Sequence, residues 1–183
     1  MVRERLIETN EALQRLENID LGALVRDQFV NAGEPAATGI PVSSGAAIGR
    51  AAFNAGAAEG LAAAGDPAIL LRPDTSTADI AGFAAAAGII TAVGGRTAHA
   101  ALVARQMGKP CVVGCRSLKI DPGERSGALG GKPLAEGDWL SVDGDTGSIY
   151  FGQRRIITER PEAELAEVAH WRAATAAPAL VEH

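Results

Sequence analysis

Residues 88–113 read Gly88-Ile-Ile-Thr-Ala-Val-Gly-Gly-Arg-Thr-Ala-His-Ala-Ala-Leu-Val-Ala-Arg-Gln-Met-Gly-Lys-Pro-Cys-Val-Val113. The apolar run at the start predicts a buried strand that ends at Gly94-Gly95. A helix is expected from about Thr97 to Met107, where Gly108 stops it, and Cys111 then begins a second strand. This β-α-β succession predicts an α/β fold.

The same alternation extends upstream of this stretch. Residues 46–53 predict a strand broken at Gly49, and residues 68–72 predict a short buried strand. Residues 77–87 predict a helix capped by Thr75 or Ser76. We therefore expect at least two successive strand-helix units before the second half of the chain.

Downstream, the pattern changes to short strands and turns. Residues 123–152 are dense in glycine, and the runs 139–142 and 148–151 flank Asp143-Gly-Asp-Thr-Gly147 as a hairpin. The expected fold class is α/β, with a mixed sheet layer and an antiparallel β portion in a β/β/α arrangement, flanked by terminal helices.

Both ends of the chain are expected to be helical. Leucines at three- and seven-residue spacings predict a helix in the first 20 residues, a second short helix is expected over 21–29, and a closing helix over 161–173. Glycine, proline and serine accumulate between residues 32 and 45 and mark a boundary. The expected organisation is a helical arm or linker at 1–35, a domain at 36–152, and a C-terminal helix and tail at 153–183.

Composition excludes several classes of protein. With 183 residues, 47% of them hydrophobic, the chain can bury the core of one domain and is not disordered. A formal net charge of −5 disfavours nucleic acid and anionic membranes as partners. The apolar stretch 82–93 is too short to cross a membrane, and the N-terminus lacks an apolar leader, so a cytoplasmic location is expected.

The two cysteines, Cys111 and Cys115, have no second pair and no histidine at zinc-ligand spacing. We expect buried, reduced thiols and no metal site, with a redox or metal role as the alternative.

Groups with chemical potential concentrate in one place, from Gly94 to His99. Two glycines let the backbone turn tightly and come close to another molecule, because no Cβ stands in the way. The first N–H groups of the following helix lack acceptors and stabilise an anion. His99 is therefore a candidate nucleophile for a phosphoryl group, and Thr97 a candidate to bind the phosphate or orient the ring. The spacing alone leaves open that His99 is only a satisfied polar residue.

The stretch Gly94-Gly-Arg-Thr-Ala-His99-Ala-Ala-Leu-Val-Ala-Arg105 with Met107-Gly-Lys-Pro-Cys-Val-Val-Gly114 resembles the phosphohistidine signature of the phosphoenolpyruvate-utilising enzymes. That family includes pyruvate phosphate dikinase, phosphoenolpyruvate synthase and enzyme I of the sugar phosphotransferase system. Four flanking segments resemble the central, swivelling phosphohistidine domain of the dikinase: Gly45-Ala-Ala-Ile-Gly49, Leu70-Leu-Arg-Pro-Asp-Thr-Ser76, Glu136-Gly-Asp-Trp-Leu140 and Asp143-Gly-Asp-Thr-Gly147. The resemblance covers nearly the whole chain.

The resemblance implies a role for each residue of the motif. His99 is the residue that is phosphorylated, and Thr97 matches the threonine that a regulatory kinase modifies in dikinases. Gly94 and Gly95 are expected to bind phosphate, whereas Arg105 is expected to dock or to pack. Arg96, which lies outside the family pattern, is a candidate to contact the phosphate, with a merely solvated side chain as the alternative. Arg96 and Ala98 depart from the Met and Ser usual in dikinases, which affects the expected partner-site geometry and regulation more than the phosphorylation.

The resemblance also implies partners, in the same chain or in separate ones. An ATP-grasp domain phosphorylates the histidine, and a TIM-barrel domain exchanges the phosphoryl group with phosphoenolpyruvate and pyruvate. ATP and Mg²⁺ are expected in those domains, and no cofactor or metal in this one. The chain is thus expected to be a phosphotransferase component that cannot complete a turnover alone.

Two alternatives remain at this point. One is the carrier domain of another family member, such as a phosphoenolpyruvate synthase or an antibiotic phosphotransferase. The other is a non-catalytic regulatory module, which the joint presence of His99, Thr97 and the two glycines disfavours.

Overall fold

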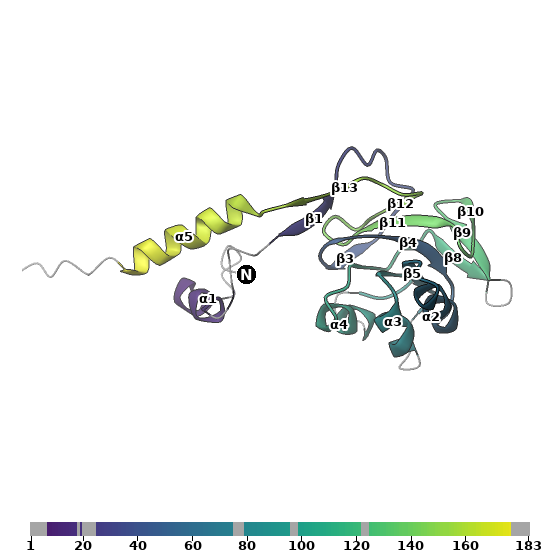
Figure 1. Ribbon diagram of the computed structural model, residues 1–183, viewed down its shortest axis with the longest axis horizontal. Coiled ribbons are helices and arrows are strands. Elements are labelled where there is room, and N and C mark those ends of the chain that lie inside the picture. The colour runs from purple at the N-terminus through teal and green to yellow at the C-terminus, as the bar shows by residue number, and fades with distance from the viewer. Residues whose placement is uncertain are drawn as a thin grey trace, which may run out of the picture. The chain divides into compact units, whose positions relative to one another are not determined.

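The structure is a computed structural model that describes residues 7–17, 19, 25–74, 79–95, 99–121 and 125–176. The chain divides into two compact units (Figure 1). Unit 1 combines Met1–Arg26 with Thr158–His183, and unit 2 is Asp27–Ile157. The chemistry-bearing segment lies wholly in unit 2.

Unit 2 is built on an eight-stranded mixed sheet with the order β2-β12-β11-β4-β5-β6-β7-β3. Neighbours from β4 to β7 are parallel, and every other pair is antiparallel. Its strands are β2 (Ala37–Thr38), β3 (Ile40–Ser43), β4 (Ala46–Ala52), β5 (Ala68–Arg72), β6 (Gly88–Thr91), β7 (Cys111–Val113), β11 (Trp139–Asp143) and β12 (Ser148–Phe151).

The sheet closes on itself at Gly39. β2 and β3 stand at opposite ends of the strand order, yet only Gly39 separates them in the chain. The Gly39 N–H donates to the Gly147 carbonyl at 2.9 Å. A Cβ at Gly39 would lie 2.6 Å from Val112 Cγ1, so only glycine fits where the two edges meet.

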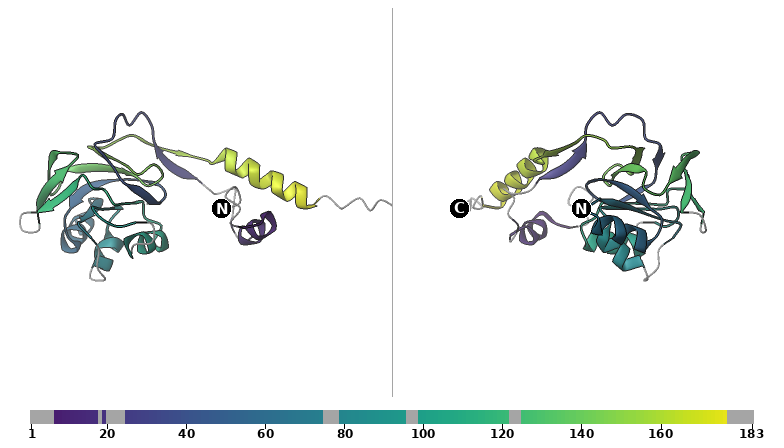
Figure 2. Two further views of the ribbon diagram at one scale, coloured as in Figure 1. Left: turned by 180° about the vertical axis from the view of Figure 1, so that it is seen from behind. Right: turned by 45° about the vertical axis from the view of Figure 1, so that its right-hand side comes forward.

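Helices cover one face of the sheet, and a second sheet covers the other. Three helices lie side by side on the first face: α2 (Ala55–Ala63), α3 (Ile80–Ala85) and α4 (His99–Gln106). A three-stranded antiparallel sheet, order β10-β9-β8, is formed by β8 (Leu118–Asp121), β9 (Ser126–Leu129) and β10 (Lys132–Ala135). In both views of Figure 2, the three helices lie on the same side of the large sheet. The expected α/β fold class, with its mixed sheet and antiparallel portion, is confirmed.

The two faces of the large sheet have different cores. Alternate side chains of the central strands point to opposite faces, so that Ile69 and Leu71 join one cluster and Leu70 the other. The cluster shared with β8, β9 and β10 is rich in leucine, isoleucine and valine. The helix side is rich in alanine. Small side chains let the helices pack close to the sheet.

Unit 1 contains α1 (Thr9–Arg15) and α5 (Glu162–Ala176), whose contacts include a hydrogen bond from the Thr175 hydroxyl to Asn10 Oδ1 at 3.4 Å. The expected closing helix is confirmed by α5. No helix among the described residues has the length and apolar character needed to cross a bilayer.

The expected helix at 21–29 is wrong over its last four residues. Residues 21–24 lie outside the described part, and Arg26–Phe29 form strand β1, which pairs with β13 (Ile156–Glu159). The Phe29 ring meets Tyr150 edge-on, with 6.0 Å between centroids. Pairing with a strand about 130 residues away overrides the local amphipathic pattern.

Two further expectations concern β4 and α3. The break expected at Gly49 is wrong, because β4 runs through it, and the missing Cβ admits the Pro67 carbonyl. The expected helix over 77–87 is present as α3, but the candidate caps Thr75 and Ser76 lie outside the described residues. Helix α2 was not anticipated.

Candidate functional site

The segment that leaves β6 toward His99 is tied to its neighbour strand. The Ala92 N–H donates to the Arg72 carbonyl and the Val93 N–H to the Pro73 carbonyl, each at 3.0 Å. The buried Thr91 hydroxyl donates to the Val93 carbonyl at 2.6 Å. The path into the glycine turn is therefore fixed by backbone bonds up to Val93.

The two glycines of the turn differ in what they allow. Gly94 has a φ of +112°, in the region that favours glycine, and its carbonyl lies 2.9 Å from where a Cβ at Gly114 would stand. Gly95 has no positive φ, and a Cβ added there would meet no atom of the described residues within 4 Å. Gly94 is needed for the turn itself, whereas no described residue of unit 2 requires a glycine at Gly95.

Helix α4 begins at His99, whose side chain is exposed. Its opposite face is formed by Ala100, Ala101 and Ala104, which are buried against the sheet. The first N–H groups of the helix lack helical acceptors and carry its positive end. An accessible imidazole thus stands at an end of a helix that favours an anion. Arg96, Thr97 and Ala98 lie outside the described residues.

Arg105 holds the second half of α4 to the edge of the sheet. Its Nε donates to the Val42 carbonyl of β3 at 2.6 Å, which gives Arg105 a structural role. Beneath the helix, burial raises the pKa of the Cys111 thiol to about 12, opposed by the positive charge of Arg105.

Cys111 and Cys115 are free and buried, as expected. They belong to the two different clusters of the core, Cys111 on the helix side and Cys115 on the other. Within the described ranges no three His, Cys, Asp or Glu side chains gather as metal ligands would.

Arg72 joins three segments near the site, a role that sequence analysis missed. Its Nη1 donates to the Phe53 carbonyl at 3.2 Å, and its Nε lies 3.0 Å from Asp79 Oδ1 as an ion pair without hydrogen-bond geometry. Asp79 precedes α3 and is 3% exposed. The end of β4, the end of β5 and the start of α3 are thereby held together. An arginine that ends an otherwise apolar strand was the available signal.

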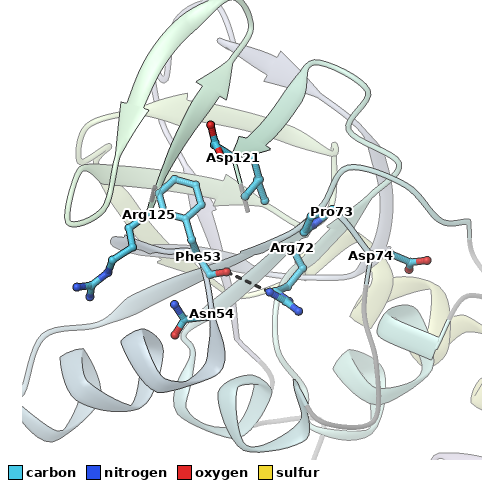
Figure 3. A pocket seen from close by; sticks show the side chains of 8 residues that line it. Phe53, Asn54, Arg72, Pro73, Asp74, Asp121 and Arg125 are labelled. Atoms are coloured by element: carbon cyan, nitrogen blue, oxygen red, sulfur yellow. Dashed lines mark hydrogen bonds between the residues drawn. The ribbon is translucent and has the colours of Figure 1, made fainter. Parts of the chain in front are cut away.

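A pocket of about 400 Å³ lies where β4 and β5 end (Figure 3). Phe53, Asn54 and Arg72 line it from the sheet side, and Asp121 and Arg125 come from β8 and the start of β9. Arg125 is already paired with Glu136 through two hydrogen bonds.

Lys109 of the motif donates to the carbonyls of Ala84 and Ala86 at 2.9 and 2.6 Å and so caps α3.

These features define a class: an α/β domain that presents a histidine at a glycine-rich helix start. Residues 64–147 match the family model described as "PEP-utilising enzyme, mobile domain". Just under half of the chain therefore resembles the mobile domain of the phosphoenolpyruvate-utilising enzymes.

The curated relatives of the chain include pyruvate, phosphate dikinases. The chain is 41% identical over 175 residues to the chloroplastic enzyme of Flaveria pringlei, which covers 93% of this chain and 18% of the relative. It is 40% identical over 175 residues to pyruvate, phosphate dikinase 2 of Oryza sativa subsp. japonica, covering 93% of this chain and 20% of that protein. The chain thus spans about a fifth of the length of these relatives.

Solved structures of Enzyme I are also similar. An NMR solution structure of the nEIt protein shares 25% identity and a TM-score of 0.32, covering 60% of this chain and 37% of that one. An N-terminal domain of "Enzyme 1 - Nitrogen" shares 22% identity and a TM-score of 0.31, over the same shares of both chains.

Proposed function

We propose that this chain is a phosphoryl carrier in which His99 is phosphorylated and passes the group between an ATP-grasp nucleotide site and a TIM-barrel phosphoenolpyruvate/pyruvate site, as part of a pyruvate phosphate dikinase-like system. The placement of His99 carries the proposal. The side chain is exposed at the first described residue of α4, four residues after Gly95, and lies inside the segment that matches the family model.

The chemistry follows from an accessible imidazole. A ring nitrogen attacks the phosphorus of phosphoenolpyruvate, a P–N bond forms, and the P–O bond breaks with its electron pair moving to the enolate oxygen. The pyruvate enolate then takes up a proton on carbon. The phosphoryl anion gains about 0.3–1 kcal/mol from the helix end when exposed, and up to ~2 when partly buried. Transfer to pyruvate is the same sequence reversed.

The remaining motif residues receive proposed roles. Gly94, Gly95 and Arg96 bind the phosphoryl group that His99 carries. Thr97 orients the ring or is the site that a regulatory kinase modifies. ATP and Mg²⁺ bind to the partner domains, in the same chain or in others, and the system works in the cytoplasm.

The whole domain is proposed to swivel between its partners. A compact domain of this size has a radius of gyration of roughly 16 Å, so one side chain cannot reach two separate active sites. Residues 1–35 and 153–175 are proposed as hinge and docking segments.

Labelling from phosphoenolpyruvate tests the proposal. The chain is incubated with [³²P]phosphoenolpyruvate and the TIM-barrel domain of a pyruvate phosphate dikinase. We expect acid-labile, base-stable label on the wild type and on His170→Ala, whose histidine is also exposed, and none on His99→Ala. Equal labelling of His99→Ala, or no labelling of the wild type, contradicts the carrier role.

Product analysis separates the dikinase from its relatives. With an added ATP-grasp domain, a dikinase consumes phosphate and releases pyrophosphate as pyruvate is converted. A water dikinase releases phosphate instead, so the absence of pyrophosphate would move the assignment to that member of the family.

A further inference from the structure

Four large apolar side chains are exposed in the described part of unit 2: Ile40, Ile80, Val93 and Leu102. Val93 and Leu102 are 52% and 51% exposed. Other large aliphatic residues of the sheet, such as Ile69, Leu71 and Ile90, are fully buried. The four exceptions therefore need an explanation, which their position supplies. We call them the docking rim.

All four lie at the carboxyl edge of the parallel strands. Val93 follows the end of β6, and Ile80 begins α3, the helix that follows β5. Ile40 is paired with Val113, the last residue of β7. Leu102 lies in the N-terminal half of α4. Because parallel strands end at a common edge, the docking rim and the start of α4 share one end of unit 2.

Two of these side chains are close to the histidine turn by direct geometry. Leu102 follows His99 by three residues, so the two occupy the same side of α4 one turn apart, opposite the buried alanines. Ile40 Cδ1 lies 3.5 Å from the Cβ position of Gly114, and that position lies 2.9 Å from the Gly94 carbonyl. The docking rim thus reaches both the helix and the glycine turn.

We propose that the docking rim seats against the surface around the TIM-barrel phosphoenolpyruvate site each time His99 enters it. This inference rests on the proposed function. The imidazole must come within about 3–3.5 Å of the phosphorus, so the partner has to cover the surface within one turn of His99. Apolar side chains there are withdrawn from water and help to keep water out of the transfer.

The size of the docking rim suits a contact that must be released. Four half-exposed side chains contribute far less than the roughly 800 Å² per partner of a stable complex. A carrier needs such a contact, because it must leave one site to visit the next. A second copy of the chain would need a larger face to remain bound, so we assign the docking rim to the partner domain.

The labelling assay, run at varied concentrations of the TIM-barrel domain of a pyruvate phosphate dikinase, tests this. Val93→Ser and Leu102→Gln are each compared with Ala135→Ser, a control at an exposed residue of β10 that lies outside the docking rim and outside the proposed hinge and docking segments. We expect each rim variant to raise the partner concentration for half-maximal labelling about five-fold, the factor for roughly half of such a side chain leaving water. The maximal rate and the melting temperature should match those of Ala135→Ser.

Each other outcome has a definite meaning. If the wild type is not labelled at any partner concentration, the proposed function fails. If the wild type is labelled and the rim variants saturate like Ala135→Ser, the docking surface alone is overturned. A reduced maximal rate with unchanged half-saturation also overturns it, because the variants then disturb His99 instead of docking. A dimer that the rim variants convert to monomer identifies a second copy as the occupant.

Discussion

Helices α4 and α5 each carry an exposed histidine, His99 and His170, but their settings are opposite. α4 buries three alanines against the sheet, and its first described residue is its histidine, four residues after Gly95. α5 is almost twice as long, has no buried side chain among those described, and carries its histidine at an interior position. Exposure alone therefore does not mark a functional histidine.

The difference lies in what holds the backbone beneath the ring. Around α4, the ties are the Arg72 contacts, the bonds from Ala92 and Val93, and the Arg105 bond to β3. At the start of α5, the Leu165 N–H donates to the Pro161 carbonyl, and Arg160 forms an exposed ion pair with Glu162. A reactive group must be held in place to meet a partner reproducibly, so substitutions around α4 should cost more than equivalent ones around α5.

The largest difference is expected between the two arginine ion pairs. Arg72→Leu leaves the buried Asp79 carboxylate without its cation and should lower the free energy of unfolding by about 3 kcal/mol. Arg160→Leu breaks an ion pair in which Arg160 Nε lies 3.5 Å from Glu162 Oε1 and both side chains are exposed. This substitution should change the free energy of unfolding by less than about 0.5 kcal/mol. Urea unfolding of the full chain measures both. The double variant Arg72→Leu/Asp79→Leu should recover much of the loss, and equal losses in the two single variants would refute the contrast.

The buried face of α4 should resist a larger side chain. Ala101 is completely buried between α4 and the sheet, so Ala101→Leu should cost about 2 kcal/mol and lower the rate of His99 labelling as the helix shifts. Ala169→Leu makes the same change on the exposed surface of α5 and should be close to neutral. Thermal melting and the labelling assay report both effects. An unchanged melting temperature and labelling rate in Ala101→Leu would mean that α4 is not closely packed against the sheet.

A pH dependence is expected from the thiol beneath α4. The folded-state pKa of Cys111 is about 12 because of burial, so the unfolded chain releases this proton first as the pH rises above about 9. The folded state then holds more protons, and stability falls with rising pH, by about 1 kcal/mol between pH 9 and 10. Urea unfolding at pH 8, 9 and 10 should show this fall in the wild type and a smaller one in Cys111→Ala. Parallel curves for the two proteins would contradict it.

Local patterns predicted the elements that local signals define. The strand at 88–91, the helix around 99–106, the 139–151 hairpin and the closing helix all carry periodicity and stop signals within a few residues. β1 was mistaken for a helix because its partner β13 is far away in the chain. Closure of the large sheet at Gly39 was equally invisible, since it depends on strands from three distant segments.

The same division applies to the site. The candidate roles of His99 and the two glycines could be predicted because all three residues lie within one short stretch of sequence. Arg72 was not, because its role depends on Phe53 and Asp79, which come from different elements, and on a backbone bond to Ala92. The motif contains the proposed reacting group, and the tertiary contacts around it appear only in the folded chain.

The smallest expected effect on stability separates the two glycines of the turn. Gly94→Ala forces alanine to a φ of +112°. It should lower the free energy of unfolding by about 1 kcal/mol or more, which is the cost of such backbone strain. Gly95→Ala meets no atom of the described part of the chain within 4 Å and should leave the free energy of unfolding within about 0.5 kcal/mol of the wild type. If a phosphoryl group and its donor site come close to the backbone here, the added methyl group should nevertheless slow His99 labelling several-fold. Normal stability with slow labelling would place the need for glycine at Gly95 in the encounter, whereas normal labelling would show that the backbone approach occurs at Gly94 or at the helix start instead.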